Sequence, residues 1–193
     1  MCGRYIFSNE ENEFAGKIIA GAKKSLNKEI FEKISLFDVF PSDQALVVTA
    51  NKNSGQLHVS PMKWGYRGRN GRIIINARSE TAFQDNSFFS GSVPCAVPCS
   101  GYYEWSSDKQ KYTFDIDEPF FLGGLCRFEN NELYFVILTE EASFPQNEIH
   151  DRQPVLFTYK NIKAWTECSQ PALLLKYSVK RRNMHNSQKS ELL

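Results

Sequence analysis

The chain has 193 residues, a formal net charge of +1, 41% hydrophobic residues and 23% charged residues. This composition is ordinary for a globular protein and excludes a disordered or collagen-like chain. The length suits one domain with a core of its own. No apolar run approaches the roughly 20 residues that span a bilayer, and the acidic residues Glu10, Glu11 and Glu13 argue against a secretory signal. The small net charge disfavours a globally basic nucleic-acid-binding protein but is compatible with a local basic groove.

The sequence contains five cysteines, an odd number that does not pair completely. Without a secretory signal we interpret them as reduced thiols and expect a cytoplasmic protein, nucleoid-associated if the source is bacterial. Cys95 and Cys99 have a spacing that half of a zinc site can use, but no second pair of Cys or His follows at the usual distance. We therefore expect no metal, no cofactor and no membrane association. Nothing in the sequence suggests an oligomer, so we expect a monomer.

The N-terminal region predicts an amphipathic helix. Ser8 and Glu11 have the spacing of a capping box. Apolar residues then recur at helical spacing, at Phe14, Ile18, Ile19 and Ala22. We expect one helix over residues 9–24 and a second, short helix over residues 161–167.

The rest of the chain is dominated by short segments that are typical of strands. They are apolar or alternating and rich in β-branched and aromatic residues, and they cover residues 45–50, 56–60, 72–76, 111–116, 120–125, 133–139 and 155–159. Turn residues bound most of them, Asn70-Gly71 and Asn130-Asn131 among them. This pattern predicts an α+β fold that is mostly antiparallel β, with a barrel-like sheet and a few flanking helices. We expect a single domain over residues 1–175 and a polar, flexible C-terminal tail over residues 176–193.

Position 2 carries the most unusual chemistry of the sequence. Met1 precedes a small residue, and its removal leaves Cys2 with a free α-amine and a thiol on adjacent carbons. Ordinary pKa values of about 7.7–8.0 for the amine and about 8.5 for the thiol leave a usable fraction of each nucleophile near neutral pH. The amine forms a Schiff base with an aldehyde, and the thiol then closes a five-membered thiazolidine ring. Taken alone, Cys2 is more simply a small residue after Met1, and an N-terminal cysteine also suits amide hydrolysis.

A basic segment over residues 63–79 is typical of a site for single-stranded nucleic acid. It contains no acidic residue, and its cations are interleaved with Trp64 and Tyr66. Aromatic rings stack on bases while cations neutralise phosphates. A solvated hairpin that turns at Asn70-Gly71 explains the same residues, and the two interpretations are compatible. The cations are Lys63, Arg67, Arg69, Arg72 and Arg78.

Three further polar residues are candidates for catalysis. Asn76 ends an apolar strand, and His150 is one of three histidines. Glu104 is the only acidic residue between Asp85 and Asp108 and stands among aromatic residues. Apolar surroundings raise the pKa of a carboxyl group, which suits it to general acid–base catalysis near neutral pH. Each residue also has a simpler explanation, as a helix cap, a surface histidine or an exposed strand carboxylate.

The combination of these candidate residues, in this order along the chain, supports a functional site better than any one of them does. The sequence resembles the SRAP family, whose name stands for SOS response-associated peptidase, in separated blocks from residue 2 to residue 154. The blocks are Met1-Cys2-Gly3-Arg4-Tyr5, Pro61-Met62-Lys63-Trp64-Gly65, Asn76-Ala77-Arg78-Ser79-Glu80-Thr81, Ser100-Gly101-Tyr102-Tyr103-Glu104-Trp105 and His150-Asp151-Arg152 with Pro154. One departure is Gln153, which stands where the family usually has Met. We expect Gln153 to line the wall of the site.

This resemblance implies a protein that senses abasic sites in single-stranded DNA. It implies a reversible thiazolidine crosslink through processed Cys2 that shields the lesion, with lyase-type chemistry and removal of Met1 by the protein itself. The implied catalytic roles are Cys2 as nucleophile, Asn76 holding the amine or the sugar, Glu104 opening the sugar ring and assisting reversal, and His150 moving protons of the Schiff base. The implied DNA contacts are Arg4 and Arg78 on phosphates, with Trp64, Gly65 and Pro41 along the DNA path.

Two other functions explain part of the pattern. A thiol peptidase or amidohydrolase that uses processed Cys2 would need no DNA, and it leaves the basic segment unexplained. A non-catalytic module for single-stranded DNA would bind abasic and intact DNA equally well after Cys2→Ala. The combination of Cys2 with Asn76, Glu104 and His150 favours the crosslinking enzyme. We expect these four side chains to line one pocket beside the basic groove.

Overall fold

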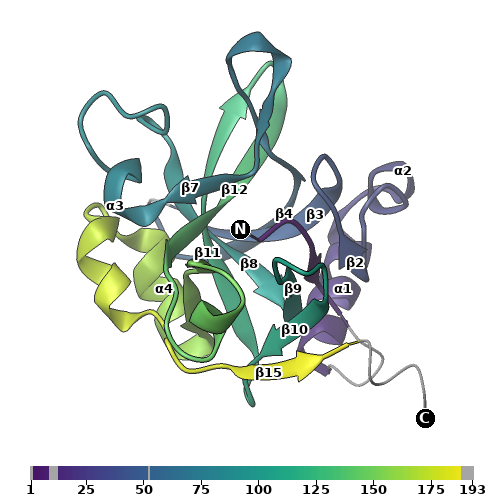
Figure 1. Ribbon diagram of the computed structural model, residues 1–193. Helices are drawn as coiled ribbons and strands as arrows, with labels where there is room; N and C mark the ends of the chain where they lie inside the picture. The colour runs from purple at the N-terminus through teal and green to yellow at the C-terminus, as the bar shows by residue number, and fades with distance from the viewer. Residues whose placement is uncertain (1, 9–12, 52, 188–193) are drawn as a thin grey trace.

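The structure is a computed structural model, and it describes residues 2–8, 13–51 and 53–187 (Figure 1). No helix among these residues has the length and apolarity to cross a membrane. The helices are α1 (Glu13–Ser25), α2 (Lys28–Phe31), α3 (Ser79–Ala82) and α4 (Tyr159–Glu167), with short 3-10 helices η1 (Arg69–Gly71), η2 (Gln146–Glu148) and η3 (Pro171–Tyr177).

Five strands close into a barrel. Their order is β12-β4-β3-β8-β11, and the ring closes because β11 pairs again with β12. Most pairs are antiparallel, but β12 runs parallel to β4 and to β7. The predicted α+β fold with a barrel-like, mostly antiparallel sheet is therefore confirmed. The strands of this sheet are β3 (Gln44–Ala50), β4 (Leu57–Trp64), β7 (Asn76–Arg78), β8 (Val93–Cys99), β11 (Phe120–Glu129), β12 (Glu132–Glu141), β13 (Arg152–Pro154) and β14 (Leu156–Thr158).

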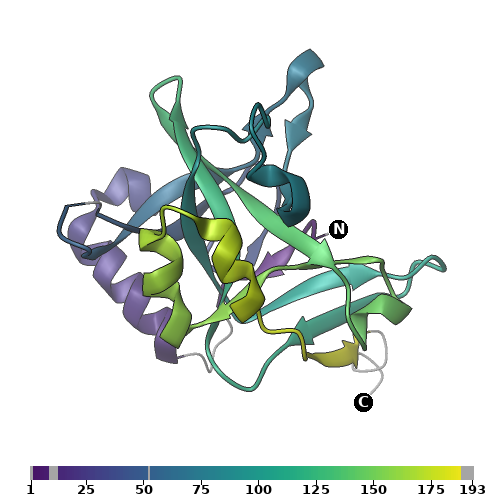
Figure 2. The same ribbon diagram turned by 90° about the vertical axis from the view of Figure 1, so that its left-hand side faces the viewer.

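A second sheet places the N-terminal strand β1 beside β9, a strand from the middle of the sequence. Its order is β15-β10-β9-β1-β2, and β1 pairs with β9 so that Tyr5 lies opposite Tyr102. A separate hairpin of β5 and β6 projects from the body of the molecule (Figure 2). The strands are β1 (Tyr5–Ile6), β2 (Asp38–Val39), β5 (Tyr66–Arg67), β6 (Ile73–Ile74), β9 (Gly101–Trp105), β10 (Lys111–Asp115) and β15 (Asn183–Asn186).

The alternation of side chains along the strands divides the core into two clusters. Val136 packs in one cluster and Ile137 in the other, because successive residues of a strand point to opposite faces. Trp165 of α4 packs in the same cluster as Val136, and its ring stacks on that of Phe157 with centroids 4.8 Å apart. Cys2 belongs to the cluster that contains Ile137, so the N-terminal segment is part of the core.

Most of the predicted elements are present, with differences at their ends, but β8 and β9 were not predicted. The predicted helix over 9–24 corresponds to α1, and its first residues, together with Glu11 of the expected capping box, lie outside the described residues. The expected strand over 72–76 is split into β6 and β7, because the chain leaves β5 and pairs with β12 instead. The expected strand over 155–159 is shorter, since Tyr159 begins α4. The short helix over 161–167 lies inside α4.

The C-terminal segment differs from the expected flexible tail. Asn183–Asn186 forms β15, which pairs with β10 along four registered positions. Arg182, which belongs to the tail predicted to be polar and flexible, is only 4% exposed. Residues 188–193 of the predicted tail lie outside the described residues. Composition does not reveal this strand because three of its four residues are polar, and pairing with β10 satisfies their backbone groups.

Candidate active site

Cys2 and Asn76 are in direct contact. Cys2 is 0% exposed and lies just before β1. Asn76 begins β7, and its Nδ2 donates a 2.9 Å hydrogen bond to the Cys2 carbonyl oxygen. The Oδ1 atom of Asn76 is buried and has no hydrogen-bond partner among the described residues. Asn76 therefore fixes the Cys2 backbone with one end of its amide and offers an acceptor at the other.

The Cys2 thiol is held in its protonated form. Burial raises the pKa of this thiol strongly, and the negative charge of Glu104 raises it further. The Sγ atom lies 3.9 Å from the Arg4 carbonyl oxygen. A thiol in this environment needs a base beside it before sulfur can act as a nucleophile.

Glu104 is a buried carboxyl group beside Cys2. It lies on β9 and is 3% exposed. Burial raises its pKa from the ordinary 4.5 to about 7, and the negative charge of Asp151 contributes to the rise. Near neutral pH this carboxyl group is therefore divided between its acid and base forms, which suits it to both donating and accepting a proton.

His150 lies in the loop between η2 and β13, and its protonation is set by the backbone. Its Nδ1 atom accepts a 2.9 Å hydrogen bond from the Arg152 N–H and also lies 2.8 Å from Asp151 Oδ1. These contacts require opposite protonation states of Nδ1. The backbone bond decides, because the Asp151 side chain is 82% exposed and free to turn away. Burial lowers the pKa of His150, so the ring is neutral and carries its proton on Nε2.

An ion pair joins the His150 loop to the segment that follows Asn76. The Arg152 guanidinium donates to both carboxylate oxygens of Glu80, at 2.7 and 2.8 Å, and to the Thr139 carbonyl at 2.6 Å. The hydrogen bonds from Arg152 lower the pKa of Glu80. Both residues belong to motifs in the sequence, but spacing alone does not reveal that they pair.

Trp64 and Tyr66 do not form a stacking surface. Both side chains are 0% exposed. The Trp64 ring packs against Tyr5 and Phe135, and its Nε1 donates a 3.0 Å hydrogen bond to the Ile75 carbonyl. The expectation that these rings stack on bases is wrong, because they complete the core instead.

The backbone around Trp64 forms a tight junction. Gly65 has a φ of +114°, and a Cβ at this position would lie 2.3 Å from the Cγ2 atom of Ile73. The half-buried Pro41 lies beside this junction, because the next residue, Ser42, donates its N–H to the Trp64 carbonyl at 2.9 Å. Pro41 and Gly65 are thus neighbours through backbone contacts.

Arg4 is already engaged by the protein. Its guanidinium forms an ion pair with Asp38 and lies 4.8 Å from the Phe40 ring centroid and 4.6 Å from that of Tyr103. The side chain remains 26% exposed. A phosphate that binds Arg4 must therefore compete with Asp38.

Aromatic residues that the sequence interpretation missed lie on the same face. Phe40 is 45% exposed and Trp105 is 39% exposed. The Trp105 ring centroid lies 6.3 Å from that of Tyr103, and Lys111 Nζ lies 4.4 Å from the Tyr103 ring. Strand alternation gives the signal that was missed, since Trp105 must point away from the side of β9 that buries Glu104. We call Arg4, Phe40, Tyr103, Trp105 and Lys111 the outer face.

The basic segment lies on and beside the projecting hairpin. Arg67 on β5, Arg69 on η1 and Arg72 just before β6 are exposed, and Arg78 is exposed at the end of β7. The hairpin turns at Asn70 and Gly71, which have φ values of 64° and 73°. The sequence-based hairpin is confirmed, and its cations face solvent.

A family model described as SOS response associated peptidase (SRAP) matches residues 1–189. The chain belongs to the SRAP family. It is 31% identical over 148 residues to "Abasic site processing protein YobE" of Bacillus subtilis, covering 67% of each chain. It is 26% identical over 180 residues to "Abasic site processing protein YedK" of Escherichia coli, covering 86% of this chain and 79% of YedK.

A solved structure supports the SRAP fold. The crystal structure of a phage-related protein from Bordetella bronchiseptica superimposes with a TM-score of 0.69 over 95% of this chain and 93% of that one, at 17% identity. At this identity the likeness concerns the fold alone.

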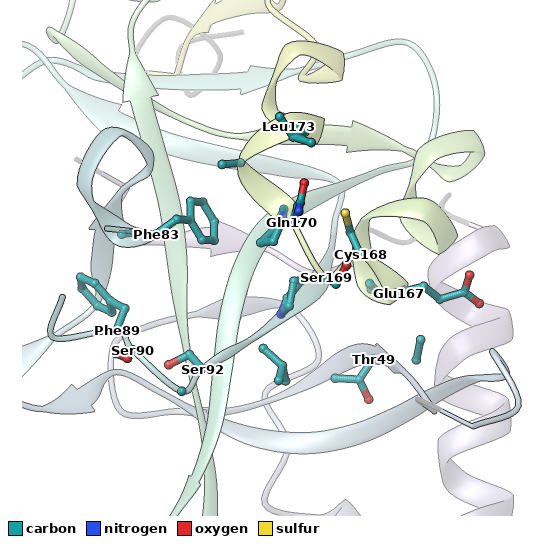
Figure 3. Close-up of a pocket in the computed structure, with 18 of the residues that line it drawn as sticks. Thr49, Phe83, Phe89, Ser90, Ser92, Glu167, Cys168, Ser169, Gln170 and Leu173 are labelled. Carbon is teal, nitrogen blue, oxygen red and sulfur yellow. The ribbon is translucent and has the colours of Figure 1, made fainter. Parts of the chain in front are cut away.

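A large cavity of this SRAP chain lies apart from the predicted site residues. It has a volume of about 1320 Å³ and lies between the α4–η3 segment, β3 and the loop after α3 (Figure 3). Phe83, Phe89, Glu167 and Gln170 are among the residues that line it. None of the predicted site residues lines this cavity, so its size does not locate the site.

Proposed function

We propose that this chain processes abasic sites in single-stranded DNA by forming a thiazolidine crosslink through Cys2. Membership of the SRAP family and the names of its relatives, abasic site processing proteins, support this substrate class. The observation that carries the proposal is the arrangement at the N-terminus: Cys2 is fixed by Asn76, with the buried acid Glu104 beside it.

The first half of the reaction converts the sugar into an aldehyde and captures it. Glu104 donates a proton to the ring oxygen as the C1′–O4′ bond breaks, and the C1′ hydroxyl releases its proton to solvent to give the aldehyde. After removal of Met1, the α-amine of Cys2 adds to C1′, one proton is taken up from solvent, and one water leaves as the protonated Schiff base forms. Neutral His150, which carries its proton on Nε2, is suited to move protons during this loss of water.

The second half closes the ring. The sulfur of Cys2 forms a bond to C1′, its proton passes to the Glu104 carboxylate, and the electron pair of the C=N bond returns to nitrogen. Glu104 has then recovered the proton that it gave to the ring oxygen. The net change is the loss of one water, and the reverse sequence releases the DNA.

The high thiol pKa distinguishes this reaction from amide hydrolysis. A cysteine peptidase depends on a thiolate, which usually means a lowered thiol pKa. Here burial and Glu104 raise it. In the crosslinking reaction the amine attacks first, and sulfur adds within the same residue to an activated carbon, so a protonated resting thiol is acceptable. Removal of Met1 by the protein itself stays a prediction, tested by the intact mass of Cys2→Ala and Glu104→Gln chains expressed in parallel.

The outer face and the basic hairpin together supply a path for the DNA strand. Phe40 and Trp105 present ring faces for bases, while Lys111 and Arg4 supply positive charge. Pro41 and Gly65 connect this face to the hairpin, whose arginines neutralise further phosphates. The proposal places bases on Trp105 and Phe40 rather than on Trp64.

A denaturing gel tests the proposed function. Processed protein, with loss of Met1 confirmed by mass, is incubated with a single strand that carries one abasic site, and Cys2→Ala and Cys2→Ser are run alongside. We expect a heat-stable shifted band with the unaltered chain and none with either variant unless borohydride is added to trap a Schiff base. No band with the unaltered, processed chain would reject the proposal.

A further inference from the structure

Arg182 is a buried cation in the C-terminal segment. Its side chain is 0% exposed. The Nη2 atom donates to the Pro154 carbonyl at 2.8 Å and to the Val179 carbonyl at 3.1 Å. An arginine is buried in this way only when other groups bind its fork and balance its charge. The sequence predicts a polar, flexible tail over this segment and gives no indication that Arg182 is buried.

The other terminal nitrogen of Arg182, Nη1, contacts β9 and the loop that contains Gln146. Nη1 donates to the Tyr102 hydroxyl at 2.6 Å and reaches the Gln146 Oε1 atom at 3.4 Å. Tyr102 lies two residues before Glu104 on β9, so the two side chains share a face of that strand. The Gln146 carbonyl accepts the His150 N–H at 2.9 Å, and Gln146 Nε2 donates to the Arg152 carbonyl at 2.9 Å. One guanidinium thus contacts the supports of both Glu104 and His150.

Glu140 supplies the balancing charge. Its Oε1 atom lies 3.9 Å from Arg182 Nη2, and the same oxygen accepts hydrogen bonds from Gln153 at 3.0 Å and Ser178 at 2.9 Å. The second oxygen pairs with Lys180, whose side chain is 51% exposed. Gln153, which is 0% exposed, therefore orients this carboxylate. Arg182 and Glu140 are the buried ion pair of this set, and Lys180 adds a second positive charge at its exposed edge.

We propose that Arg182 is a positioning residue for the crosslinking reaction, because its guanidinium fixes β9 and the His150 loop against each other and faces the Cys2 site with positive charge. The proposal rests on the proposed function for the reaction it serves. The groups that face the Cys2 thiol are Glu104 and Tyr102 on β9, Tyr5 on β1, Cys99 on β8, and Arg182. Of these, Arg182 lowers the pKa of the thiol and Glu104 raises it.

A purely structural role makes a different prediction. Replacing a buried ion pair by apolar residues of similar volume is often neutral for stability, whereas removal of one partner leaves a buried charge and destabilises the fold. The informative variant is therefore the double substitution Glu140→Gln with Arg182→Met, which leaves no unpaired charge. Arg182→Lys keeps the charge and loses the fork. Lys180→Met is the matched control, since Lys180 also pairs with Glu140 but makes no hydrogen bond to Tyr102 among the described residues.

Two measurements on folded, full-length variants test the proposal. The first is the crosslinking rate on abasic single-stranded DNA, with the affinity for intact DNA measured separately. The second needs no DNA: it is the rate of Cys2 alkylation by iodoacetamide between neutral pH and mild alkali, followed on the Cys2 peptide by mass spectrometry. We expect the double variant to crosslink at least about tenfold more slowly with unchanged affinity, and to alkylate several-fold more slowly at each pH. Arg182→Lys should retain the alkylation rate and recover part of the crosslinking rate, and Lys180→Met should match the unaltered chain.

The outcomes separate this proposal from the proposed function. If the unaltered chain crosslinks and the folded double variant does so at the same rate, Arg182 is not a positioning residue. Equal alkylation rates in the double variant and the unaltered chain overturn the electrostatic part, whether or not DNA is crosslinked. If the unaltered chain forms no crosslink, the proposed function fails, and the alkylation rates still decide whether Arg182 acts on Cys2.

Discussion

Glu104→Gln should make the protein more stable at alkaline pH while making it a worse enzyme. The carboxyl group is 3% exposed, and burial raises its pKa from the ordinary 4.5 to about 7. Above pH 7 the folded protein therefore contains a buried carboxylate, which costs stability. Glutamine has nearly the same shape and carries no charge at any of these pH values.

The magnitude follows from the pKa difference. A rise from 4.5 to about 7 corresponds to about 3 kcal/mol at about 1.36 kcal/mol for each pKa unit. Between these two values the folded state binds more protons than the unfolded state, so the stability of the unaltered chain falls as pH rises and levels off above pH 7. The variant lacks this fall. At pH 8 it should be more stable by up to about 3 kcal/mol, or about 6–12 °C in Tm for a chain of this size.

Urea unfolding at pH 4 and at pH 8 measures this difference. We expect the free energies of unfolding of Glu104→Gln and the unaltered chain to agree at pH 4 and to diverge at pH 8. The exposed Glu118 provides the matched control, and Glu118→Gln should change neither value by more than about 0.5 kcal/mol. The reasoning is refuted if Glu104→Gln is no more stable than the unaltered chain at pH 8. In the crosslinking assay the same variant should lose about 10²- to 10⁴-fold in rate, as expected for removal of a general acid–base group.

Three further substitutions test the remaining parts of the site. Asn76→Ala removes the 2.9 Å hydrogen bond to the Cys2 carbonyl and should slow crosslinking by about tenfold or more. Asn76→Asp should be slower still, because a carboxylate would face that carbonyl. Equal crosslinking rates of the variants and the unaltered chain on a denaturing gel would exclude the role assigned to Asn76. Gly65→Ala should lower the free energy of unfolding by about 1–3 kcal/mol, since its Cβ would lie 2.3 Å from Ile73, whereas Gly71→Ala, which meets nothing within 4 Å, should cost less. Trp105→Ala should weaken binding of intact single-stranded DNA by about 1–3 kcal/mol in fluorescence anisotropy, and Tyr177→Ala, also exposed, should not.

The sequence predicts those features that depend on local pattern. Four strands of the barrel, β3, β4, β11 and β12, and the hairpin at Asn70-Gly71 follow from alternation and turn residues, whereas β8 and β9 were not predicted. Side-chain chemistry singled out Cys2 and Glu104, and the structure places both in one buried region.

The features of the site that the sequence does not predict depend on packing between residues far apart in the chain. An aromatic residue among cations suits a core as well as a DNA surface, and only the positions of Tyr5 and Phe135 show that Trp64 is internal. The polar segment that contains Arg182 gives no signal of burial, because its binding groups come from β9, β12 and the Gln146 loop. Contacts between residues so distant in the chain leave no spacing pattern to find.

The central claim is that one residue, Cys2, binds the DNA aldehyde through both its nitrogen and its sulfur. The most direct test is to digest the crosslinked complex with nuclease and protease and to identify the modified peptide by mass spectrometry after treatment with iodoacetamide. We predict the sugar remnant on the N-terminal peptide that begins at Cys2, with the mass of one lost water and no alkylation of the Cys2 sulfur. A remnant on a lysine, or a Cys2 sulfur that iodoacetamide still alkylates within the adduct, would contradict the account.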